Sequence, residues 1–550
     1  MALHPLDSVE TPAEMRRRLE AAILPQNFAR MLDEFARHYG DAEAWRFFEW
    51  QGRWTSIGYA ALRDAVYRIA DALQGFGVRQ GDHVIVMAQN RPEFPLTWLA
   101  LGCLGAVMVP ANIKYTAREI DYLVTDAEVR FAVIDPPFLD AFRASEHGRH
   151  LVDPARMVLM GPGHAGGEAG LSGLDELYDA ASARRPAGWD LPPDTVVNIQ
   201  YTSGTTGFPK GCLLTHDYWM LFGLVTYAQA GLPVRNILIA QHFYYLDPQL
   251  LLMTTLHAGA TVFVATKPSL KRFMDWVRDY QIHYCILFEP VFKAPPDPRD
   301  GDNELRVVNI YGFTAINHAP FEKRFNTRAR EAFGMTEVGA TLYVPIDRAD
   351  YTGSGACGIP LPFREAKVMV GREREAAPEE VGELWVKGRS LMQGYWKRPE
   401  VNAEHFVDGW YRTGDLFKRD AEGFFYYRGR SKDMIRRNAE NIAAREVETV
   451  LREMDQIEEA AVVAVPDELK GEEVKAYILL RPGIAAGSVS PEQILEHCAG
   501  RLARFKIPRY LAFVESFPMT MSDRVEKKVL IAGVPDLRAG SYDADEKRWR

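Results

Sequence analysis

The chain has 550 residues, more than one hydrophobic core usually organises, so at least two domains are expected. Hydrophobic residues make up 47% of the chain and charged residues 25%, which is typical of a soluble globular protein. The formal net charge of −9 argues against general binding to nucleic acid.

Cysteine usage and hydropathy indicate the compartment. Five cysteines are scattered without a CxxC pair, which fits a reducing compartment and gives no zinc site. The N-terminal segment has no apolar signal core. The longest apolar run, 95–111, is interrupted by glycine and falls short of the roughly 20 residues of a membrane span. It predicts a buried helix leading into a strand, in a soluble, cytoplasmic protein without a membrane span.

Apolar residues at helical spacing alternate with short continuous apolar runs through much of the chain. Three such helix–strand pairs are 64–76 with 83–88, 119–123 with 131–134, and 273–280 with 284–288. This alternation is typical of doubly wound, mostly parallel sheets, so the predicted fold class is α/β. Near Arg430 the pattern changes to a smaller α+β unit, with a predicted helix at 445–454 and a predicted strand at 460–465.

Residues 201–211 read YTSGTTGFPKG, a run of glycines and hydroxyl side chains that carries one lysine. Residues 195–200 predict a buried strand before it, and residues 213–228 are apolar enough for a helix after it. Glycines let backbone N–H groups approach phosphate oxygens, and a helix start adds a favourable dipole. The run therefore suits a polyphosphate. It is not a GxxxxGK[ST] loop, because Lys210 lies between Pro209 and Gly211.

This run resembles the phosphate-binding loop of the ANL superfamily of adenylate-forming enzymes, which includes acyl-CoA synthetases, adenylation domains and luciferases. Further strings similar to motifs of that family follow in the family's order: AFGMTE (332–337), YRTGD (411–415), GRSKD (429–433) and ENIAAREVE (440–448). The resemblance covers most of the chain. It implies a large N-terminal AMP-binding domain at 1–431 and a small mobile α+β domain at 432–550, with the hinge near Lys432.

The resemblance also implies a reaction. A carboxylate is a poor acyl donor, so the family first couples it to AMP with release of pyrophosphate, and the thiol of CoA then displaces AMP. This requires neutralised phosphate charge and exclusion of water from the adenylate. We therefore expect an acid–thiol ligase that uses ATP, Mg²⁺ and CoA and acts on a small carboxylic acid.

The family's roles fall on matching positions of this sequence. Thr336 is expected to hydrogen-bond the α-phosphate, and Glu337 to hold Mg²⁺, which takes one or two carboxylates plus phosphate oxygens. Phe333 would lie against adenine, and Asp415 would accept both ribose hydroxyls. The expected catalytic residues are Thr336, Glu337, Arg524 and Lys432. The expected ATP- or AMP-binding residues are Thr202, Ser203, Gly204, Thr205, Thr206, Gly207, Lys210, Gly312, Phe333, Gly334, Asp415 and Arg430.

Two strings bear on the acid. Residues 241–249 read QHFYYLDPQ, with Tyr245 where many relatives have a gating histidine, and residues 311–317 read YGFTAIN in place of a Gly-Gly-Ala-Pro segment. Both features resemble the crotonobetaine/carnitine–CoA ligase branch. The implied pocket is aromatic and apolar, with no basic group for a second carboxylate and no acidic group for an ammonium. Some of its rings could instead belong to the core. Its expected residues are Tyr244, Tyr245, Gly312, Phe313, Met335 and Val338.

The expected CoA-binding residues are Arg436, Arg437, Ala439 and Glu440. A second basic cluster at 501–509 could also meet the phosphates of CoA. Ordinary solvated surface charge explains these basic residues equally well.

The sequence departs from the family at two important positions. Arg524 stands where the family has a catalytic lysine, and arginine keeps the charge without the compact geometry of an ammonium. Ala439 stands where the family often has glycine, so a methyl group could narrow the pantetheine tunnel. Residues 327–332 (TRAREA) are also unusually polar where an apolar strand should precede Phe333.

The sequence alone is compatible with three functions. An acid–CoA ligase accounts for all the motifs. An adenylating enzyme that passes the acyl group to a carrier protein or another nucleophile would fit Ala439. A nucleotide-binding protein with impaired catalysis would fit Arg524. The sequence names neither the acid nor the oligomeric state, for which a homodimer stays open.

Overall fold

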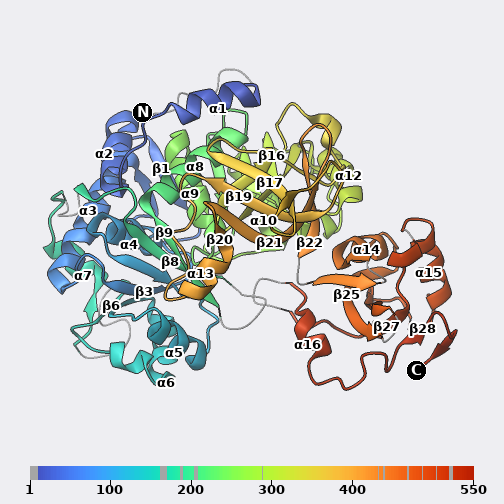
Figure 1. Ribbon diagram of the computed structural model, residues 1–550. Coiled ribbons are helices and arrows are strands. Elements are labelled where there is room, and N and C mark those ends of the chain that lie inside the picture. The colour runs from blue at the N-terminus through green and yellow to red at the C-terminus, as the bar shows by residue number, and fades with distance from the viewer. Residues whose placement is uncertain are drawn as a thin grey trace. The chain divides into compact units, whose positions relative to one another are not determined.

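The computed structural model describes residues 10–161, 170–185, 190–202, 209–287, 289–430, 433–437, 440–467, 470–485, 487–502, 504–519 and 524–550. The chain divides into two compact units (Figure 1). Unit 1 comprises residues 1–354, 358–365 and 387–409, and unit 2 comprises 355–357, 366–386 and 410–550. A separate C-terminal unit was expected. The predicted hinge residue Lys432 lies outside the described residues, so a boundary at that position stays a prediction.

The first sheet of unit 1 has the strand order β7–β6–β5–β3–β4–β8–β9. Neighbouring strands are parallel as far as β8, and β9 is antiparallel to β8. The strands are β3 (His83–Met87), β4 (Val107–Pro110), β5 (Phe131–Ile134), β6 (Met157–Leu159), β7 (Ser172–Gly173), β8 (Val196–Thr202) and β9 (Lys210–Thr215). The accompanying helices are α3 (Tyr59–Phe76), α4 (Glu93–Leu104), α5 (Ala117–Asp126), α6 (Leu139–Ala144) and α7 (Leu174–Ala180).

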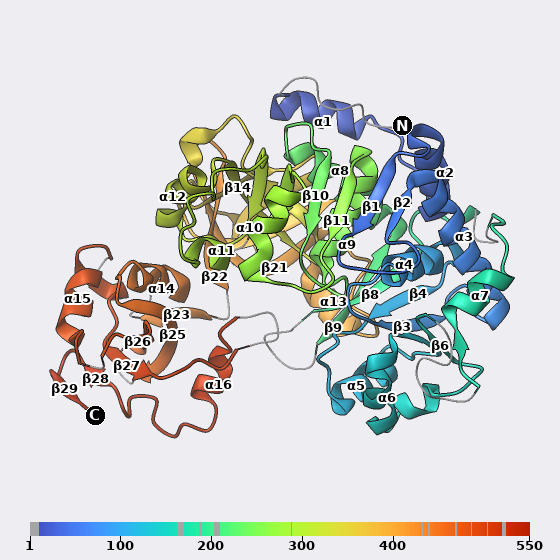
Figure 2. The same ribbon diagram turned by 180° about the vertical axis from the view of Figure 1, so that it is seen from behind.

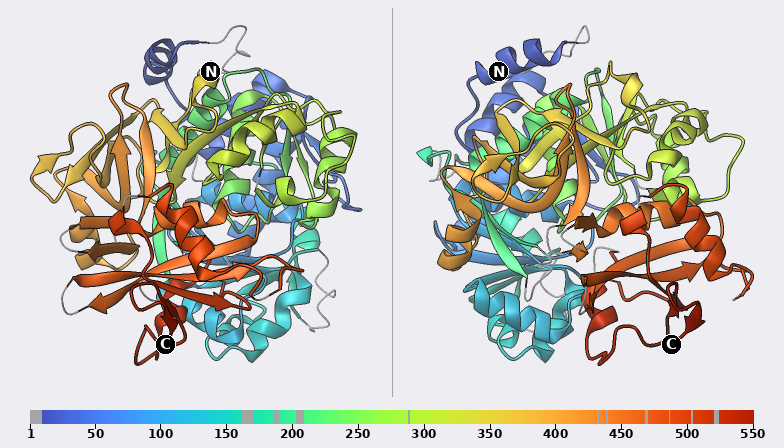
Figure 3. Two further views of the ribbon diagram at one scale, coloured as in Figure 1. Left: turned by 90° about the vertical axis from the view of Figure 1, so that its right-hand side faces the viewer. Right: turned by 45° about the vertical axis from the view of Figure 1, so that its right-hand side comes forward.

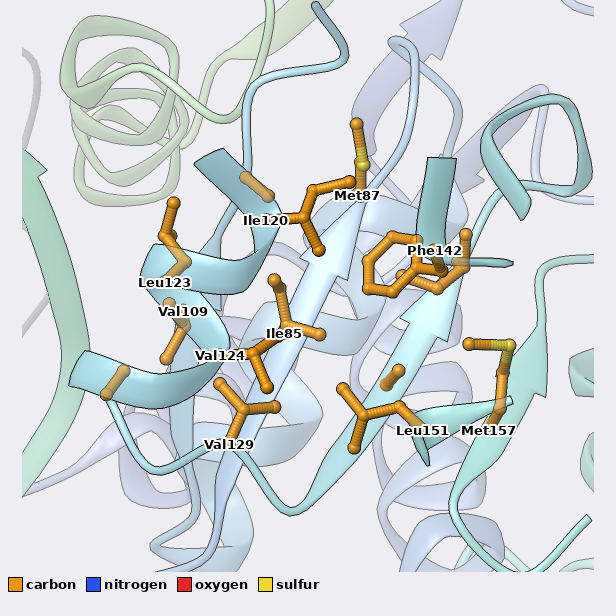
Figure 4. Close-up of a cluster of buried hydrophobic side chains, with 14 of the residues drawn as sticks. Ile85, Met87, Val109, Ile120, Leu123, Val124, Val129, Phe142, Leu151 and Met157 are labelled. Carbon is orange, nitrogen blue, oxygen red and sulfur yellow. The ribbon is translucent and has the colours of Figure 1, made fainter. Parts of the chain in front are cut away.

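The core on one face of this sheet joins strands to α5 and α6 (Figure 4). Ile85 of β3 and Val109 of β4 pack with Ile120 and Leu123 of α5, and Phe142 of α6 completes the layer. Each such side chain contributes about 1.5–3 kcal/mol when it leaves water. Burial of apolar side chains on this face of the sheet therefore explains both the four-residue apolar stretch of β5 and the amphipathic spacing of α5.

The second sheet of unit 1 includes the strand order β2–β1–β11–β10–β12–β13–β14–β15 (Figure 2). The strands from β1 to β14 in this order are parallel, whereas β2 and β15 are antiparallel to their neighbours. The strands are β1 (Glu43–Phe47), β2 (Ser56–Gly58), β10 (Asn236–Ile239), β11 (Thr261–Val264), β12 (Tyr284–Ile286), β13 (Val307–Ile310), β14 (Arg328–Met335) and β15 (Gly339–Tyr343), followed by β16 (Ala356–Pro360).

The helices of this part of unit 1 include α8 (His216–Gln229), α9 (Leu246–Ala258), α10 (Leu270–Asp279), α11 (Glu289–Lys293) and α12 (Ala315–Phe325). The N-terminal helices are α1 (Pro12–Glu20) and α2 (Phe28–Tyr39), and α13 spans Pro399–His405. All three helix–strand pairs predicted from the sequence are present, as α3 with β3, α5 with β5, and α10 with β12. The α/β fold class is confirmed.

The run at 95–111 is a buried helix, α4, followed by the buried strand β4, as predicted. No helix in the described part of the chain is long and apolar enough to cross a membrane. The five cysteines are all buried, and none of them forms a disulfide bond.

The helix predicted at 213–228 begins later than expected. Residues 213–215 belong to β9, and α8 starts at His216, where the Thr215 hydroxyl accepts a hydrogen bond from the Tyr218 N–H at 3.1 Å. The apolar residues of β9 pair with β8 instead of continuing the helix. The prediction that a helix begins at the glycine-rich loop and adds its dipole to phosphate binding is therefore wrong, because the strand β9 separates the loop from the helix.

Unit 2 contains one strand series ordered β18–β17–β19–β21–β22 and a sheet ordered β24–β23–β26–β27–β28–β29, with β25 against β26. The C-terminal sheet and its helices are drawn in orange to red in Figure 3. The strands of the series are β17 (Arg364–Val370), β18 (Arg374–Glu375), β19 (Gly382–Gly388), β21 (Trp410–Arg419) and β22 (Phe425–Arg430). The short β20 (Phe406–Val407) belongs to unit 1. The strands of the sheet are β23 (Met434–Arg437), β24 (Glu440–Ala443), β25 (Ile457–Asp467), β26 (Gly471–Leu480), β27 (Tyr510–Val514), β28 (Tyr542–Asp543) and β29 (Arg548–Trp549).

The C-terminal sheet is covered by helices on both faces. Val447 of α14 (Ala444–Arg452) and Ile494 of α15 (Pro491–Ala499) share a hydrophobic cluster with Val462 of β25. On the other face Leu530 of α16 (Lys527–Ile531) packs against Val463. The helix predicted at 445–454 and the strand predicted at 460–465 correspond to α14 and β25.

Candidate active site

The predicted phosphate-binding loop joins two antiparallel strands. β8 and β9 pair as far as Thr202 and Lys210, so one ladder fixes both ends of the loop. The Thr202 hydroxyl donates to the Lys210 carbonyl oxygen at 3.4 Å. The loop residues Ser203, Gly204, Thr205, Thr206 and Gly207 lie outside the described residues, and their role stays a prediction.

Tyr395 connects Lys210 to Glu337 within unit 1. The Lys210 ammonium nitrogen lies 4.8 Å from the centre of the Tyr395 ring. The Tyr395 hydroxyl donates a hydrogen bond of 2.8 Å to Glu337 Oε1. Tyr395 and Glu337 are 4% and 7% exposed, so the ring and the carboxylate interact away from bulk water, where such contacts are stronger. Two residues predicted from separate motifs thus belong to one cluster.

The chain around Tyr395 runs beside β9. The Trp396 N–H donates to the Gly211 carbonyl oxygen at 2.8 Å. The Asn402 side chain holds Tyr395 from the other side, since its Oδ1 accepts from the Tyr395 N–H at 2.7 Å and its Nδ2 donates to the Tyr395 carbonyl at 3.0 Å. Sequence reasoning missed Tyr395, because no spacing in the sequence links it to Lys210 or Glu337.

The string AFGMTE forms the end of β14 and the turn into β15. The Val338 N–H closes this turn by donating to the Met335 carbonyl at 3.1 Å. The Tyr218 hydroxyl of α8 donates to the Thr336 carbonyl at 3.0 Å, which ties the turn to the helix. Phe333, Gly334, Met335 and Thr336 keep exposed surface, whereas Val338 is fully buried. The exposed residues of the string are therefore accessible to a ligand.

The polar residues 327–332 have partners that account for their place in β14. Arg330 is buried, forms an ion pair of 2.8 Å with Glu322 and donates to the Ile346 carbonyl at 2.8 Å. The Glu331 carboxylate accepts a hydrogen bond of 2.6 Å from the N–H of Gly312. Gly312, a predicted nucleotide-binding residue, is thereby held next to the strand that carries Phe333.

Tyr244 and Tyr245 precede α9, with their ring centres 4.6 Å apart. Tyr244 is buried and stacks on His242, and the Asn112 side chain donates to the Tyr245 hydroxyl at 3.3 Å. Burial, aided by the charge of Lys114, lowers the pKa of His242 to about 4. The imidazole is therefore neutral near pH 7.

Phe313 and Tyr311 differ in environment. Phe313 is 8% exposed and packs edge-on against Phe321 in the cluster between the second sheet, α10 and α12. Tyr311 is 38% exposed. Tyr311 is therefore the more exposed of the two aromatic residues of the string YGFTAIN, and sequence reasoning did not include it in the acid pocket. The available signal was its position directly after the short, mostly apolar run 307–310 (VVNI).

Asp415 lies in unit 2 with Arg430 and Tyr427 around it. Asp415 is 2% exposed, pairs with Arg430 Nε at 3.1 Å, and accepts a hydrogen bond from the Tyr427 hydroxyl at 3.5 Å. Burial and the charge of Asp415 raise the pKa of Tyr427 to about 12, against the opposing charges of Arg445, Arg430 and Arg524. Exposed Arg524 is therefore within electrostatic reach of the Tyr427–Asp415 pair.

The predicted CoA-binding residues are only partly described. Arg437 pairs with fully buried Glu473 at 2.8 Å and donates to the Phe505 carbonyl at 3.0 Å, so its guanidinium has partners inside unit 2. Ala439 and Lys432 lie outside the described residues, and the side chains of Arg436 and Glu440 are not described. The CoA assignments therefore stay predictions.

A family model described as "AMP-binding enzyme" matches residues 32–396. The chain belongs to the AMP-binding enzyme family. A second model, for the C-terminal domain of AMP-binding enzymes, matches residues 446–524. Membership in the AMP-binding enzyme family confirms the resemblance drawn from the motifs.

The relatives of this AMP-binding enzyme include a crotonobetaine/carnitine–CoA ligase of Salmonella paratyphi A, 29% identical over 518 residues, or 92% of this chain and 99% of the relative. The solved structure of ATP-bound MatB from Rhodopseudomonas palustris matches with a TM-score of 0.81 at 27% identity, covering 92% of this chain and 98% of MatB. The o-succinylbenzoate–CoA synthetase MenE of Bacillus subtilis, solved with its acyl-adenylate intermediate, shares the fold with a TM-score of 0.79 at 23% identity, covering 94% of this chain and 100% of MenE.

Proposed function

We propose that this chain is an ATP-dependent acid–CoA ligase. A carboxylic acid reacts with ATP to give acyl-adenylate and pyrophosphate, and CoA then displaces AMP to give the thioester. The cluster of Lys210, Tyr395 and Glu337 supports the proposal most directly. It holds a cation for phosphate oxygens beside a buried carboxylate, the pair of charges that phosphate transfer requires.

The chain's own residues supply the parts of the first step. Glu337 is suited to hold Mg²⁺, which would offset the negative charge of the phosphates. Lys210 would bind the β- and γ-phosphates, and Thr336 the α-phosphate. Phe333 and Gly334 offer exposed surface for the adenine.

Asp415 is proposed to bind the ribose hydroxyls, because a carboxylate accepts two hydrogen bonds and this buried one is already paired with the Arg430 guanidinium. Arg524 is proposed to take the place of the family lysine in the first step. Its electrostatic reach to Tyr427 supports this role, and its bidentate guanidinium can span carboxylate and phosphate oxygens.

The relatives favour CoA over a carrier protein as the acyl acceptor, and catalysis over simple nucleotide binding, since the curated relatives are named as CoA ligases. A small acid, ATP and CoA are the proposed substrates. We further propose a cytoplasmic reaction, where ATP and CoA are available, and a homodimer as the assembly to be tested.

Mass spectrometry of the products formed from ATP, Mg²⁺ and a panel of acids, with and without CoA, tests the proposal. AMP, pyrophosphate and an acyl-CoA are expected together. Acyl-AMP without acyl-CoA would redirect the second step to another acceptor. A panel of short, branched, aromatic and betaine-type acids that yields neither AMP nor pyrophosphate would refute the ligase.

A further inference from the structure

Residues 389–396 form a strap that lies along β9, at the edge of the first sheet. The Gln393 N–H donates to the Leu213 carbonyl oxygen, and the Leu213 N–H donates to the Gly394 carbonyl oxygen, both at 3.0 Å. Tyr395 pairs with the same strand in an antiparallel bridge. The strap therefore continues the hydrogen bonding of the sheet by one short segment, and Tyr395 is part of that segment.

The strap holds both the main chain and the side chain of Glu337. The Met392 N–H donates to the Glu337 carbonyl oxygen at 3.0 Å. Further along the strap, the Tyr395 hydroxyl donates to the Glu337 carboxylate at 2.8 Å. A displacement of the strap would therefore move the donor that orients this carboxylate.

One carboxylate, that of Asp217, anchors the side chains at the beginning of the strap. The Arg389 guanidinium donates to it twice, from Nε at 2.7 Å and from Nη2 at 2.5 Å. The Ser390 hydroxyl donates to the same carboxylate. The main chain at Arg389 has a separate partner, because the buried Arg364 guanidinium donates to the Arg389 carbonyl oxygen at 2.5 Å. Asp217 is thus the residue on which the side-chain hydrogen bonds of Arg389 and Ser390 converge.

Ser390 has a backbone conformation that requires such a contact. Its φ is +60°, in the left-handed region that residues with a Cβ rarely adopt. A strained residue of this kind persists only where surrounding contacts hold it. The Asp217 side chain is 16% exposed, and its two-bond pairing with Arg389 is the stronger type of ion pair. The anchor at Asp217 therefore maintains a conformation that the strap would not keep by itself.

The first turn of α8 also holds the turn that carries Thr336 and Glu337. Asp217 is followed by Tyr218, whose hydroxyl donates to the Thr336 carbonyl oxygen at 3.0 Å. Neighbouring residues of one helix thus fix both the strap and the turn that the strap contacts. Because a helix is a more precise support than a loop, this arrangement is suited to hold the Glu337 carboxylate in one position.

We propose that Asp217 is a positioning residue for the nucleotide site: it holds the strap, the strap holds Tyr395, and Tyr395 orients the Glu337 carboxylate for Mg²⁺. This inference rests on the role of Glu337 in the ligase function proposed above. Removal of a partner that orients a metal ligand from outside the coordination shell typically weakens metal binding. Asp217 acts in this way without itself being a metal ligand.

Calorimetry of ATP binding at a series of Mg²⁺ concentrations tests this inference without any acid substrate. Asp217→Asn keeps the size of the side chain and removes its charge. We expect the Mg²⁺ concentration for half-maximal ATP affinity to rise about 3-fold or more, and the affinity at saturating Mg²⁺ to stay within about 2-fold of the wild type. Hydrogen exchange of the peptide that contains the strap should become faster in the same variant. An equal loss of ATP affinity at every Mg²⁺ concentration, or an unchanged Mg²⁺ dependence, would overturn the inference.

Asp179→Asn is the matched control. Asp179 makes a two-bond ion pair with Arg53 in unit 1, at 2.8 and 3.2 Å, so this change removes the same kind of contact from another place in the unit. Both readouts should keep their wild-type values. Arg389→Gln removes the ion pair with Asp217 from its more exposed side, 43% against 16%, and should reproduce the effect even where Asp217→Asn fails to fold. A wild-type Mg²⁺ dependence in Arg389→Gln would contradict the role of the anchor.

A double variant of Asp217→Asn with Tyr395→Phe tests the route through Tyr395. Independent effects on the Mg²⁺ requirement would multiply to within about 2-fold. We expect instead that the double variant requires little more Mg²⁺ than Tyr395→Phe alone, because both changes release the same carboxylate. Multiplied effects would overturn the route. A chain that released no pyrophosphate with any acid would refute the proposed reaction, whereas these binding measurements would still decide the role of Asp217.

Discussion

The Tyr395 hydroxyl and the Glu337 carboxylate share a buried hydrogen bond of 2.8 Å, and the same tyrosine ring carries the Lys210 ammonium on its face. One side chain therefore orders both charged residues, although each comes from a different motif. The tyrosine is a positioning residue, because its own hydroxyl is occupied by Glu337.

Tyr395→Phe should weaken this arrangement without removing the ring. Glu337 would lose a donor while buried, at a cost of about 1–3 kcal/mol. We expect the Mg²⁺ concentration required for half-maximal activity to rise several-fold and kcat/KM to fall about 10-fold, measured by pyrophosphate release. Tyr343→Phe is the control, since the Tyr343 hydroxyl donates to the weakly polar sulfur of Met15, at 3.8 Å. An unchanged Mg²⁺ dependence in Tyr395→Phe would contradict the positioning role.

Arg524 should be required for the first half-reaction. Arg524→Ala is expected to lower acid-dependent exchange of pyrophosphate into ATP about 100-fold, whereas Arg524→Lys should keep most of the activity, because the positive charge remains. Lys528→Ala is the control, since Lys528 is an exposed cation in the neighbouring helix α16. Equal exchange in wild type and Arg524→Ala would exclude Arg524 from catalysis. Higher exchange in Arg524→Lys would show that arginine limits the natural chain.

Asp415 should contribute to nucleotide affinity more than to the chemical step. Asp415→Asn keeps the shape of the side chain but leaves Arg430 facing a neutral group. We expect the Kd for ATP, measured by calorimetry, to rise about 10-fold or more, together with some loss of stability from the lost ion pair. Asp420→Asn in the same unit is a suitable control, because it changes a more exposed carboxylate. Unaltered ATP affinity in Asp415→Asn would remove the ribose assignment.

Acid should destabilise unit 1 through buried histidines. Burial lowers the pKa of His257 from 6.5 to about 4 and that of His216 to about 3. Below pH 6.5 the unfolded chain therefore binds protons that the folded chain does not. Stability is fully present above pH 6.5 and falls as the pH drops towards 4 and 3, by up to about 1.4 kcal/mol per pH unit for each histidine.

Urea unfolding at several pH values measures this slope. His257→Gln should make the slope shallower, even where it lowers stability overall. A slope identical in wild type and His257→Gln would show that His257 is not protonated on unfolding in this range.

The regular parts of the fold could be predicted because their cause is local. The apolar spacing of α5 and the continuous apolar run of β5 each specify an element by periodicity alone. The start of α8 could not, because residues 213–215 are apolar in either structure. Only pairing with β8, a non-local contact, decides that they form a strand.

The residues of the candidate site could be predicted from the sequence where they lie in a motif, and not elsewhere. Lys210 and Glu337 were identified by their strings, and the structure brings them together. Tyr395 contacts both residues but lies outside every motif. The segment that carries it comes to lie beside β9 only in the folded chain, so no local pattern in the sequence reveals the contact. The polar stretch at Arg330 and Glu331 similarly has no local explanation, since its partners are Glu322 and Gly312.

The burial of all five cysteines has a chemical consequence for a protein that handles a thiol and an activated acyl group. Burial raises the pKa of Cys103 and Cys285 and that of Cys498, in the last case to about 12, so these thiols stay protonated and unreactive. An acyl-adenylate finds no protein thiolate among them to acylate in place of CoA, and oxidised CoA finds no partner for a mixed disulfide. A cysteine introduced on the surface would accordingly be the one readily alkylated position, which makes the chain well suited to site-specific labelling.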